Sequence, residues 1–309
     1  MHPILHHYPP SLFSEKIRVL LGYLNLEWQS VIIPPIMPRP DLMPLSGGYR
    51  KTPILQVGAN VYCDTQIISR HLARTAGNTT LYAQGFAADQ VARWADTELF
   101  RTVVALNFRP QALTAQMSQM SAADIEAFQQ DRAQLSAGAP IVSVDPGTAE
   151  ANFLSLLGNL DASLADDFLF GADPSIADFS LYHCLWFVAN NEANASLMEG
   201  WSRVQAYLER MQQFGHGSYQ EIGAADALTI GREAEPVTPA DAKVDAQLAG
   251  GLTAGDPVTV AADDYGKNPL TGSLVSCTRD EIVILRHDPD AGAIMLHVPQ
   301  IGFELRRAE

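Results

Sequence analysis

The stretch RKTPILQVGANVYCDT, residues 50–65, decides how the first part of the chain folds. Two short apolar, β-branched segments flank a turn at Gly58, and this spacing predicts a β-hairpin. A helix is predicted to begin at Asp64 or Thr65, since both residues are good N-caps, and to end near Gly77. A hairpin that leads directly into a helix therefore closes the first folding unit.

Upstream of this hairpin the chain alternates strand and helix signals. A short apolar segment at Ile4 predicts a strand, and apolar residues at helical spacing follow Ser11. Residues 28–33 predict a second strand, and residues 34–50 are rich enough in Pro and Gly to predict a long surface loop. The predicted order over residues 1–80 is thus β-α-β-β-β-α, an α+β arrangement.

After residue 80 the pattern changes to amphipathic helices. Residues 86–230 predict an all-helical domain, because their apolar residues recur every three to four positions. Within it, the stretch PSIADFSLYH carries Ser175 and Asp178 at capping-box spacing, with Asp in place of the usual Glu. We assign this pair to structure, as a buried helix cap, and not to catalysis.

The last part of the chain predicts a third unit. Residues 231–245 have the composition of a linker, and residues 246–309 contain short β-branched segments separated by turn signals. This spacing predicts five short strands in a small, all-β, SH3-like barrel that is separate from the rest.

Composition narrows the class of protein. The chain has 309 residues, 47% apolar and 18% charged, which is typical of a soluble globular protein. Its net charge of −15 argues against nucleic acid and anionic membrane as partners, although residues 1–80 carry 7 basic against 4 acidic residues. No segment is apolar for long enough to span a membrane, and the first residues lack a secretory signal pattern, so we expect a cytoplasmic protein. The three scattered cysteines, with no metal-binding spacing, are expected to be reduced and buried.

Three motifs in order resemble the glutathione transferase family. They are YPPSLFSEKIR at residues 8–18, RKTPIL followed by VYCDT at residues 50–65, and PSIADFSLYH at residues 174–183. The resemblance implies a thioredoxin-like, glutathione-binding domain in residues 1–80 and an all-helical transferase domain in residues 86–230. The C-terminal β-module is not part of the usual architecture of that family.

The resemblance also implies a residue that supports the thiol of glutathione. A free thiol has a pKa of about 8.5 and reacts as the thiolate, so a hydroxyl donor near helix N-terminal amides would favour the reactive anion. Ser11 lies at the matching turn, and Tyr8 is the second candidate. From the residues alone, Ser11 is equally a simple N-cap serine, and Tyr8 an exposed tyrosine at the end of a strand.

Further positions follow from the same motifs. In the family a proline that is normally cis exposes the backbone of the preceding residue to the cysteinyl unit, as Pro53 would for Thr52. Asp64 and Thr65 would hold the charged γ-glutamyl end, and one of Arg39, Arg50 and Lys51 would bind the glycine carboxylate. For the electrophile, the family pattern indicates an apolar pocket, whose members are equally well explained as core residues: Leu12, Phe100, Val104 and Phe108.

The function implied is that of a cytosolic glutathione transferase with a role in detoxification. It would use glutathione as co-substrate and no metal, act on a small hydrophobic electrophile or a peroxide, and form a homodimer. Serine at the thiol-contact position makes disulfide exchange a less favoured reaction than conjugation. The alternative is a catalytically silent family member, a ligand-binding or scaffolding protein whose C-terminal module recruits a protein partner.

Overall fold

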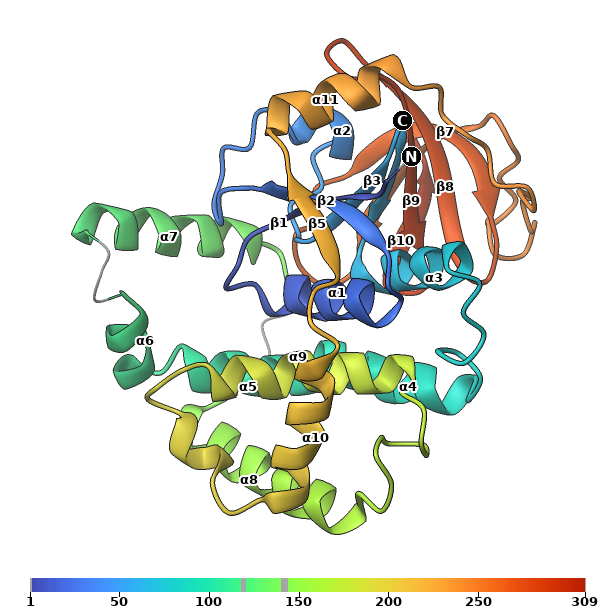
Figure 1. The fold of residues 1–309 in the computed structure, drawn as a ribbon. Coiled ribbons are helices and arrows are strands. Elements are labelled where there is room, and N and C mark those ends of the chain that lie inside the picture. Colours follow the sequence, from blue (N-terminus) through green and yellow to red (C-terminus); the bar gives the residue numbers. More distant parts are fainter. Residues whose placement is uncertain (1, 118–120, 140–143, 309) are drawn as a thin grey trace.

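A single mixed β-sheet runs through the computed structural model, which describes residues 2–117, 121–139 and 144–308 (Figure 1). The sheet has 10 strands in the order β10-β6-β7-β8-β9-β4-β3-β1-β2-β5. The strands are β1 (Ile4–His7), β2 (Glu27–Ile32), β3 (Ile54–Val57), β4 (Asn60–Cys63), β5 (Ser218–Glu221), β6 (Pro257–Ala262), β7 (Leu270–Cys277), β8 (Glu281–Asp288), β9 (Gly292–Pro299) and β10 (Phe303–Arg307). The helices are α1 (Leu12–Tyr23), α2 (Met43–Ser46), α3 (Thr65–Thr75), α4 (Phe86–Trp94), η1 (Ala95–Leu99), α5 (Phe100–Asn107), α6 (Pro110–Met117), α7 (Ala122–Leu135), α8 (Pro146–Ser163), α9 (Ile176–Ala189), η2 (Ala195–Met198), α10 (Ser202–Gln213) and α11 (Ala224–Glu233).

The first domain has the predicted strand and helix order, and the hairpin is confirmed. Strands β3 and β4 pair antiparallel with Leu55 opposite Tyr62, while β1 pairs parallel with β2 and antiparallel with β3. The expected surface loop between β2 and β3 differs in one respect. It contains the short helix α2 and buries Leu42, Leu45 and Tyr49 against the sheet. The burial of these apolar side chains is favourable and holds the Pro-rich segment in place.

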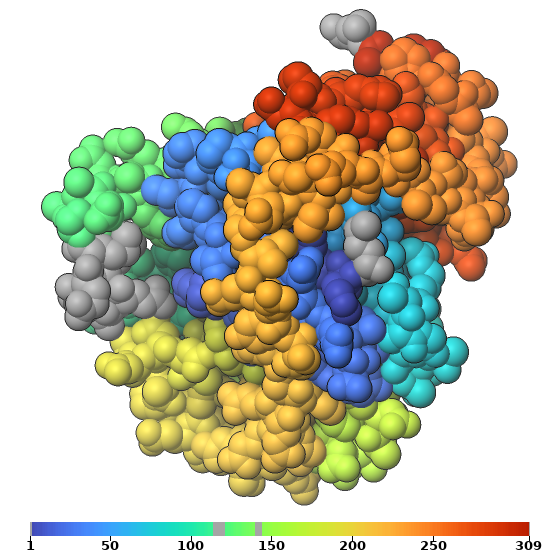
Figure 2. Space-filling model, turned by 45° about the horizontal axis from the view of Figure 1, so that its top comes forward, coloured from blue at the N-terminus to red at the C-terminus, as the bar shows by residue number. Residues whose placement is uncertain are grey.

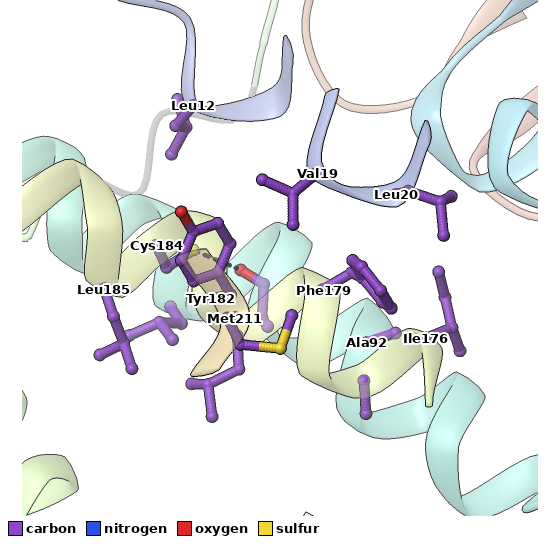
Figure 3. Close-up of a cluster of buried hydrophobic side chains, with 14 of the residues drawn as sticks. Leu12, Val19, Leu20, Ala92, Ile176, Phe179, Tyr182, Cys184, Leu185 and Met211 are labelled. Carbon is purple, nitrogen blue, oxygen red and sulfur yellow. Dashed lines mark hydrogen bonds between the residues drawn. The ribbon is translucent and has the colours of Figure 1, made fainter. Parts of the chain in front are cut away.

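The helical domain packs on the first domain through α1 and α9. Figure 3 shows Leu12, Val19 and Leu20 of α1 facing Phe179 and Tyr182 of α9 across one apolar core. The predicted helical character of this region is confirmed, and the helix that follows the PSIADFSLYH cap is α9 itself. A single π-helical turn, η1, interrupts the long helix formed by α4 and α5.

The C-terminal region forms the five predicted strands, β6 to β10, but they do not close into a barrel of their own. Strand β9 pairs in parallel with β4, with Val61 opposite Leu296 and Tyr62 opposite His297. One apolar core spans both sets of strands: Ile4, Val31, Ile54, Val61, Ile282, Ile284, Ile294 and Leu296 are among its buried residues. The C-terminal module therefore continues the first sheet and shares its core.

The chain between the helical domain and this module also departs from the expected boundaries. Strand β5 follows α10 and pairs with β2, and α11 then lies over the first domain near α2. Figures 1 and 2 show this segment as a continuous band across the first domain. Residues 231–245, expected to be a linker, are held by the side chain of Asn60, which bonds both N and O of Val237, and by Lys243, whose O accepts from the amide of Cys277.

Two further expectations concern thiols and membranes. Cys63, Cys184 and Cys277 are free and buried, and burial raises the pKa of each thiol. Such thiols are poor nucleophiles. Among the described residues, no helix is both long and apolar enough to cross a membrane.

Candidate functional site

One large cavity, of about 1090 Å³, opens between the first domain, helices η1 and α5, and the loop between β6 and β7. Its walls include every residue that the sequence analysis assigned to thiol, glutathione or electrophile: Tyr8, Ser11, Leu12, Arg39, Arg50, Lys51, Thr52, Pro53, Asp64, Thr65, Phe100, Val104 and Phe108. Candidate residues from three separate regions of the sequence, residues 8–12, 39–65 and 100–108, thus line the same cavity.

Ser11 is the N-cap of α1. Its hydroxyl oxygen accepts a hydrogen bond from the amide of Ser14 at 3.2 Å, and its own O–H remains available to donate toward the cavity. Tyr8, one turn earlier, lines the same cavity, and its carbonyl accepts from the amide of Ser11 at 3.2 Å. The two candidate thiol donors are therefore neighbours, with Ser11 the one that lies at a helix N-terminus.

The proposed γ-glutamyl subsite lies at the start of α3. Asp64 caps this helix from a positive φ of 95°, and its carboxylate accepts from the amide of Gln66 at 2.9 Å. Burial raises the pKa of Asp64, while Lys51 and the Gln66 amide act in the opposite direction. Thr65 follows as the first residue of α3 and is buried. The peptide bond between Thr52 and Pro53 is cis, in keeping with the resemblance.

All three cations considered for a ligand carboxylate already have partners. Arg39 is buried and donates to the carbonyls of Pro34, Pro35 and Arg50 and to the hydroxyl of Thr52, so it braces the β2–β3 loop.

Arg50 and Lys51 each form an ion pair with a residue outside the first domain. Arg50 pairs with Asp131 of α7 at 2.6 Å. Lys51 pairs with Asp264 of the β6–β7 loop at 2.5 Å, and its ammonium lies 4.3 Å from the centre of the Tyr265 ring. The sequence analysis missed Asp131, Asp264 and Tyr265, because no local pattern connects them with residues 50–65.

A buried polar cluster lies beside the cavity, between α1 and the helical domain. Lys16 donates to Asp96 of η1 at 2.7 Å, and His183 of α9 donates to the same carboxylate at 2.9 Å. Burial raises the pKa of Asp96, but Lys16 and His183 lower it more, so it lies below its usual range. Burial lowers the pKa of His183. Lys16 also donates to the hydroxyl of Thr65 at 3.4 Å, which links this cluster to the start of α3.

The far wall of the cavity is aromatic. Phe100 packs against Phe13 with ring centres 4.9 Å apart and stacks on Tyr265 at 6.4 Å. Phe108 stacks on Phe128 of α7 at 6.3 Å. Leu12 is mostly buried, whereas Phe108 is 38% exposed, so this wall can receive an apolar ligand.

Asp178 has the structural surroundings that the sequence predicts. Its carboxylate accepts from the amide of Leu169 and from both the amide and the hydroxyl of Ser175, each at 2.8 Å. It does not line the cavity. In the part of the chain that the structure describes, no group of three or more His, Cys, Asp or Glu side chains is placed to hold a metal ion.

Comparisons with known proteins identify two domains of the chain. Residues 5–80 match the family model for the glutathione S-transferase N-terminal domain, and residues 110–210 match the model for its C-terminal domain. No protein of curated function matches the chain.

Solved structures extend the likeness. A GST-like protein from Pseudomonas syringae is 36% identical with a TM-score of 0.81, and the match covers 99% of each chain. Poplar glutathione transferase F1 is 12% identical with a TM-score of 0.50, over 69% of this chain and 92% of that one. FzlA from C. crescentus is 17% identical with a TM-score of 0.50, over 76% and 94%. The last two share the fold alone, whereas the first also covers the C-terminal module. The chain belongs to the glutathione S-transferase family.

Proposed function

We propose that this protein is a glutathione transferase that activates the glutathione thiol for attack on a small apolar electrophile. One observation carries the proposal: Ser11, at the N-terminus of α1, lines the same cavity as the polar pair Asp64 and Thr65 and the aromatic wall at Phe100. Thiol activation, peptide binding and an apolar acceptor site are thus available within a single cavity.

The roles follow from the chemistry of each group. The Asp64 carboxylate pairs with the γ-glutamyl ammonium, and the Thr65 hydroxyl and helix N-terminal amides bind the carboxylate beside it. The backbone of Thr52 pairs with the cysteinyl unit in a strand-like manner. The peptide then runs from α3 toward the N-terminus of α1, where its sulfur meets Ser11.

At that point the Ser11 hydroxyl donates a hydrogen bond to the sulfur and favours the thiolate. With an aryl halide, the thiolate forms a carbon–sulfur bond while the carbon–halogen bond breaks and halide leaves, and the thiol proton passes to solvent. The protein's own contribution is to position the two reactants and to stabilise the anion. Neither step requires a metal.

The wider setting belongs to the same proposal. We propose that the protein acts as a cytoplasmic homodimer in the removal of reactive compounds. The competing proposal is a silent family member that binds a ligand or a protein partner without turnover. Such a protein would give no conjugate from glutathione and an electrophile, and its C-terminal module would recruit the partner.

The test is turnover with glutathione and a generic aryl halide in three serine variants. Ser11→Ala should lower kcat/KM by about 100-fold while glutathione binding persists, because one donor to the developing anion is lost. Ser11→Gly should be equally inactive, but it should keep most of the stability of α1, because glycine is a tolerable N-cap. Loss of activity in this variant would therefore reflect the missing hydroxyl and not a destabilised helix. Ser14→Ala is the matched control, since the buried Ser14 hydroxyl does not line the cavity.

Other outcomes reassign the role. Full activity in Ser11→Ala together with loss in Tyr8→Phe would make Tyr8 the thiol donor. Absence of turnover in the unaltered protein would favour the silent alternative, and absence of glutathione binding would refute the proposed transferase.

A further inference from the structure

A buried ion pair forms part of the cavity wall beside the start of α3. Asp96 lies in the π-helical turn η1, and both it and Lys16 of α1 line the cavity. The carboxylate of Asp96 accepts hydrogen bonds from Lys16 at 2.7 Å, from His183 at 2.9 Å and from the hydroxyl of Ser180 at 3.3 Å. Turns of this kind are frequent at functional sites. Donors from α1 and α9 thus hold this carboxylate, and the carboxylate in turn holds Lys16.

Lys16 determines in which direction the hydroxyl of Thr65 can donate. The side chain of Lys16 is 1% exposed, and its ammonium donates to Asp96 and, at 3.4 Å, to the hydroxyl oxygen of Thr65. An ammonium group can only donate, so the Thr65 oxygen accepts from it and the Thr65 proton must point away from Lys16. Among the residues that the structure describes, none accepts this proton. The Thr65 hydroxyl is therefore a donor without an acceptor.

This unpaired donor lies in the wall of the cavity, where a ligand can reach it. Thr65 is the first residue of α3, lines the cavity and is buried. A buried donor without an acceptor costs free energy, and an acceptor atom on a ligand recovers it. The N-terminus of α3 and the ammonium of Lys16 both favour an anion at this point, whereas the neighbouring Asp64 favours a cation. A carboxylate and an ammonium on one carbon atom, as in an α-amino acid, satisfy both.

We propose that Lys16 is a positioning residue that makes this site select peptides with a free α-carboxylate on the γ-glutamyl unit. It directs the proton of Thr65 toward that carboxylate and places a positive charge near it. The proposal rests on the proposed function, because it assumes that the γ-glutamyl end lies at the start of α3. Since Asp96 holds Lys16, the helical domain contributes to the choice of a peptide that the first domain binds.

The experiment measures by calorimetry the Kd of glutathione and of 4-aminobutanoyl-cysteinyl-glycine, which keeps the ammonium group but lacks the α-carboxylate. The unaltered, full-length protein should bind glutathione more tightly. Lys16→Gln should weaken glutathione binding by about tenfold and leave binding of the analogue nearly unchanged, because a charged contribution to the carboxylate site is lost. Both peptides bind the same folded protein, so a loss of stability changes both Kd values by the same factor and leaves their ratio unaltered.

Arg18→Gln is the matched control for this variant. It removes another buried cation from the same helix, but Arg18 does not line the cavity, so any weakening should fall equally on both peptides. A double-mutant cycle with Thr65→Val shows whether Lys16 acts through the Thr65 hydroxyl. In that background, most of the effect of Lys16→Gln on the ratio of the two Kd values should disappear.

Two results would overturn the proposal. An equal change of both Kd values in Lys16→Gln would make Lys16 a purely structural residue, and an undiminished effect in the Thr65→Val background would exclude the route through the hydroxyl. Binding of both peptides by the unaltered protein with equal Kd values would refute the selection for the carboxylate alone. If neither peptide binds, the proposed function fails as a whole, which is a distinct result.

Discussion

Two of the contacts between the first domain and the rest of the chain differ in kind. The helical interface, between α1 and the helices η1 and α9, buries charged groups. Lys16 pairs with Asp96, and Glu15, which pairs with Arg18 within α1, accepts a hydrogen bond from the hydroxyl of Tyr182. The strand interface, between β4 and β9, depends on a parallel ladder of backbone bonds over a continuous apolar core. This interface buries a charged contact, between Glu281 of β8 and His297 of β9, whereas Lys51 and Asp264 pair at its periphery.

This difference indicates how each part of the chain is coupled to the site. Buried ion pairs fix geometry but are costly to break and titrate with pH. The backbone ladder and apolar packing do not themselves titrate, and they depend on the presence of the whole partner strand. We therefore expect the two interfaces to respond to different perturbations.

The largest effect should come from removing the strand interface. Ending the chain after Ala234 leaves β4 without β9 and uncovers apolar residues of the shared core, such as Val61 and Ile54. Each uncovered aliphatic side chain costs about 1.5–3 kcal/mol, and the total stability of a domain is only about 5–15 kcal/mol. We expect this truncated chain to lose cooperative thermal unfolding and to aggregate in size-exclusion chromatography.

Removal of residues 303–309 alone is the control for that truncation. It deletes the edge strand β10, which pairs only with β6, and the protein should remain folded. A soluble, glutathione-binding chain that ends at Ala234 would instead show that the module is separable, as composition alone suggests.

A single buried charge should matter next most, and more for the Lys16 pair of the helical interface than for the Lys51 pair. Lys16 is only 1% exposed, and Lys16→Met removes a counter-charge from the buried carboxylate of Asp96. The free energy of unfolding in urea should therefore fall by about 3 kcal/mol. Lys51→Met breaks the pair at the strand interface, whose carboxylate is 37% exposed, and should cost about 1 kcal/mol or less. Equal losses in both variants would contradict the distinction between the two interfaces.

Acid should weaken the protein through carboxylates with a lowered pKa and through buried histidines such as His6, whose pKa burial lowers to about 4. The share of any one group should be the smallest of these effects. Burial raises the pKa of both Glu15 and Asp96. His216 and Arg18 lower the pKa of Glu15 by more than burial raises it. Lys16 and His183 do the same for Asp96, so both carboxyl groups have a lowered pKa. A carboxyl group with a lowered pKa stabilises the folded state above its unfolded pKa of about 4, and this stability is lost as the pH falls through the folded value.

The measurement is Tm as a function of pH from neutral to about pH 3. Tm should begin to fall below about pH 6.5, because the unfolded chain then protonates histidines that the folded chain keeps neutral. The further fall below about pH 4 should be shallower in Asp96→Asn, which cannot titrate there. Glu304→Gln, at an exposed pair on β10, should follow the unaltered profile. An identical acid slope in Asp96→Asn would show that this carboxyl group does not contribute.

Local signals predicted much of the fold and the walls of the cavity. The hairpin at residues 54–63, the N-caps Ser11 and Asp64 and the cap of α9 all depend on neighbours within a few residues, so the sequence pattern suffices. The five C-terminal strands were predictable for the same reason, since β-branched residues alternate with turns.

What escaped prediction depends on distant partners. Strand β5, with the sequence SYQE, is fully exposed and has no apolar pattern, and it is a strand only because β2 offers an edge. Nothing in strand β4 indicates that β9, more than 200 residues later, pairs beside it. Asp131 and Asp264 look like solvated charges in the sequence, and only the folded chain brings them to Arg50 and Lys51.

The strand order carries a consequence for assembly. Because β5 covers β2 and β9 covers β4, the described strands of the thioredoxin-like domain all lie inside the sheet, and the free edges are β5 and β10. Strand β5 has four polar, exposed residues, and β10 carries Glu304, Arg306 and Arg307. Short or charged edges resist the addition of a strand from another molecule. A second copy of this chain would therefore dock on helices and loops, and growth into fibrils by edge-to-edge pairing is disfavoured.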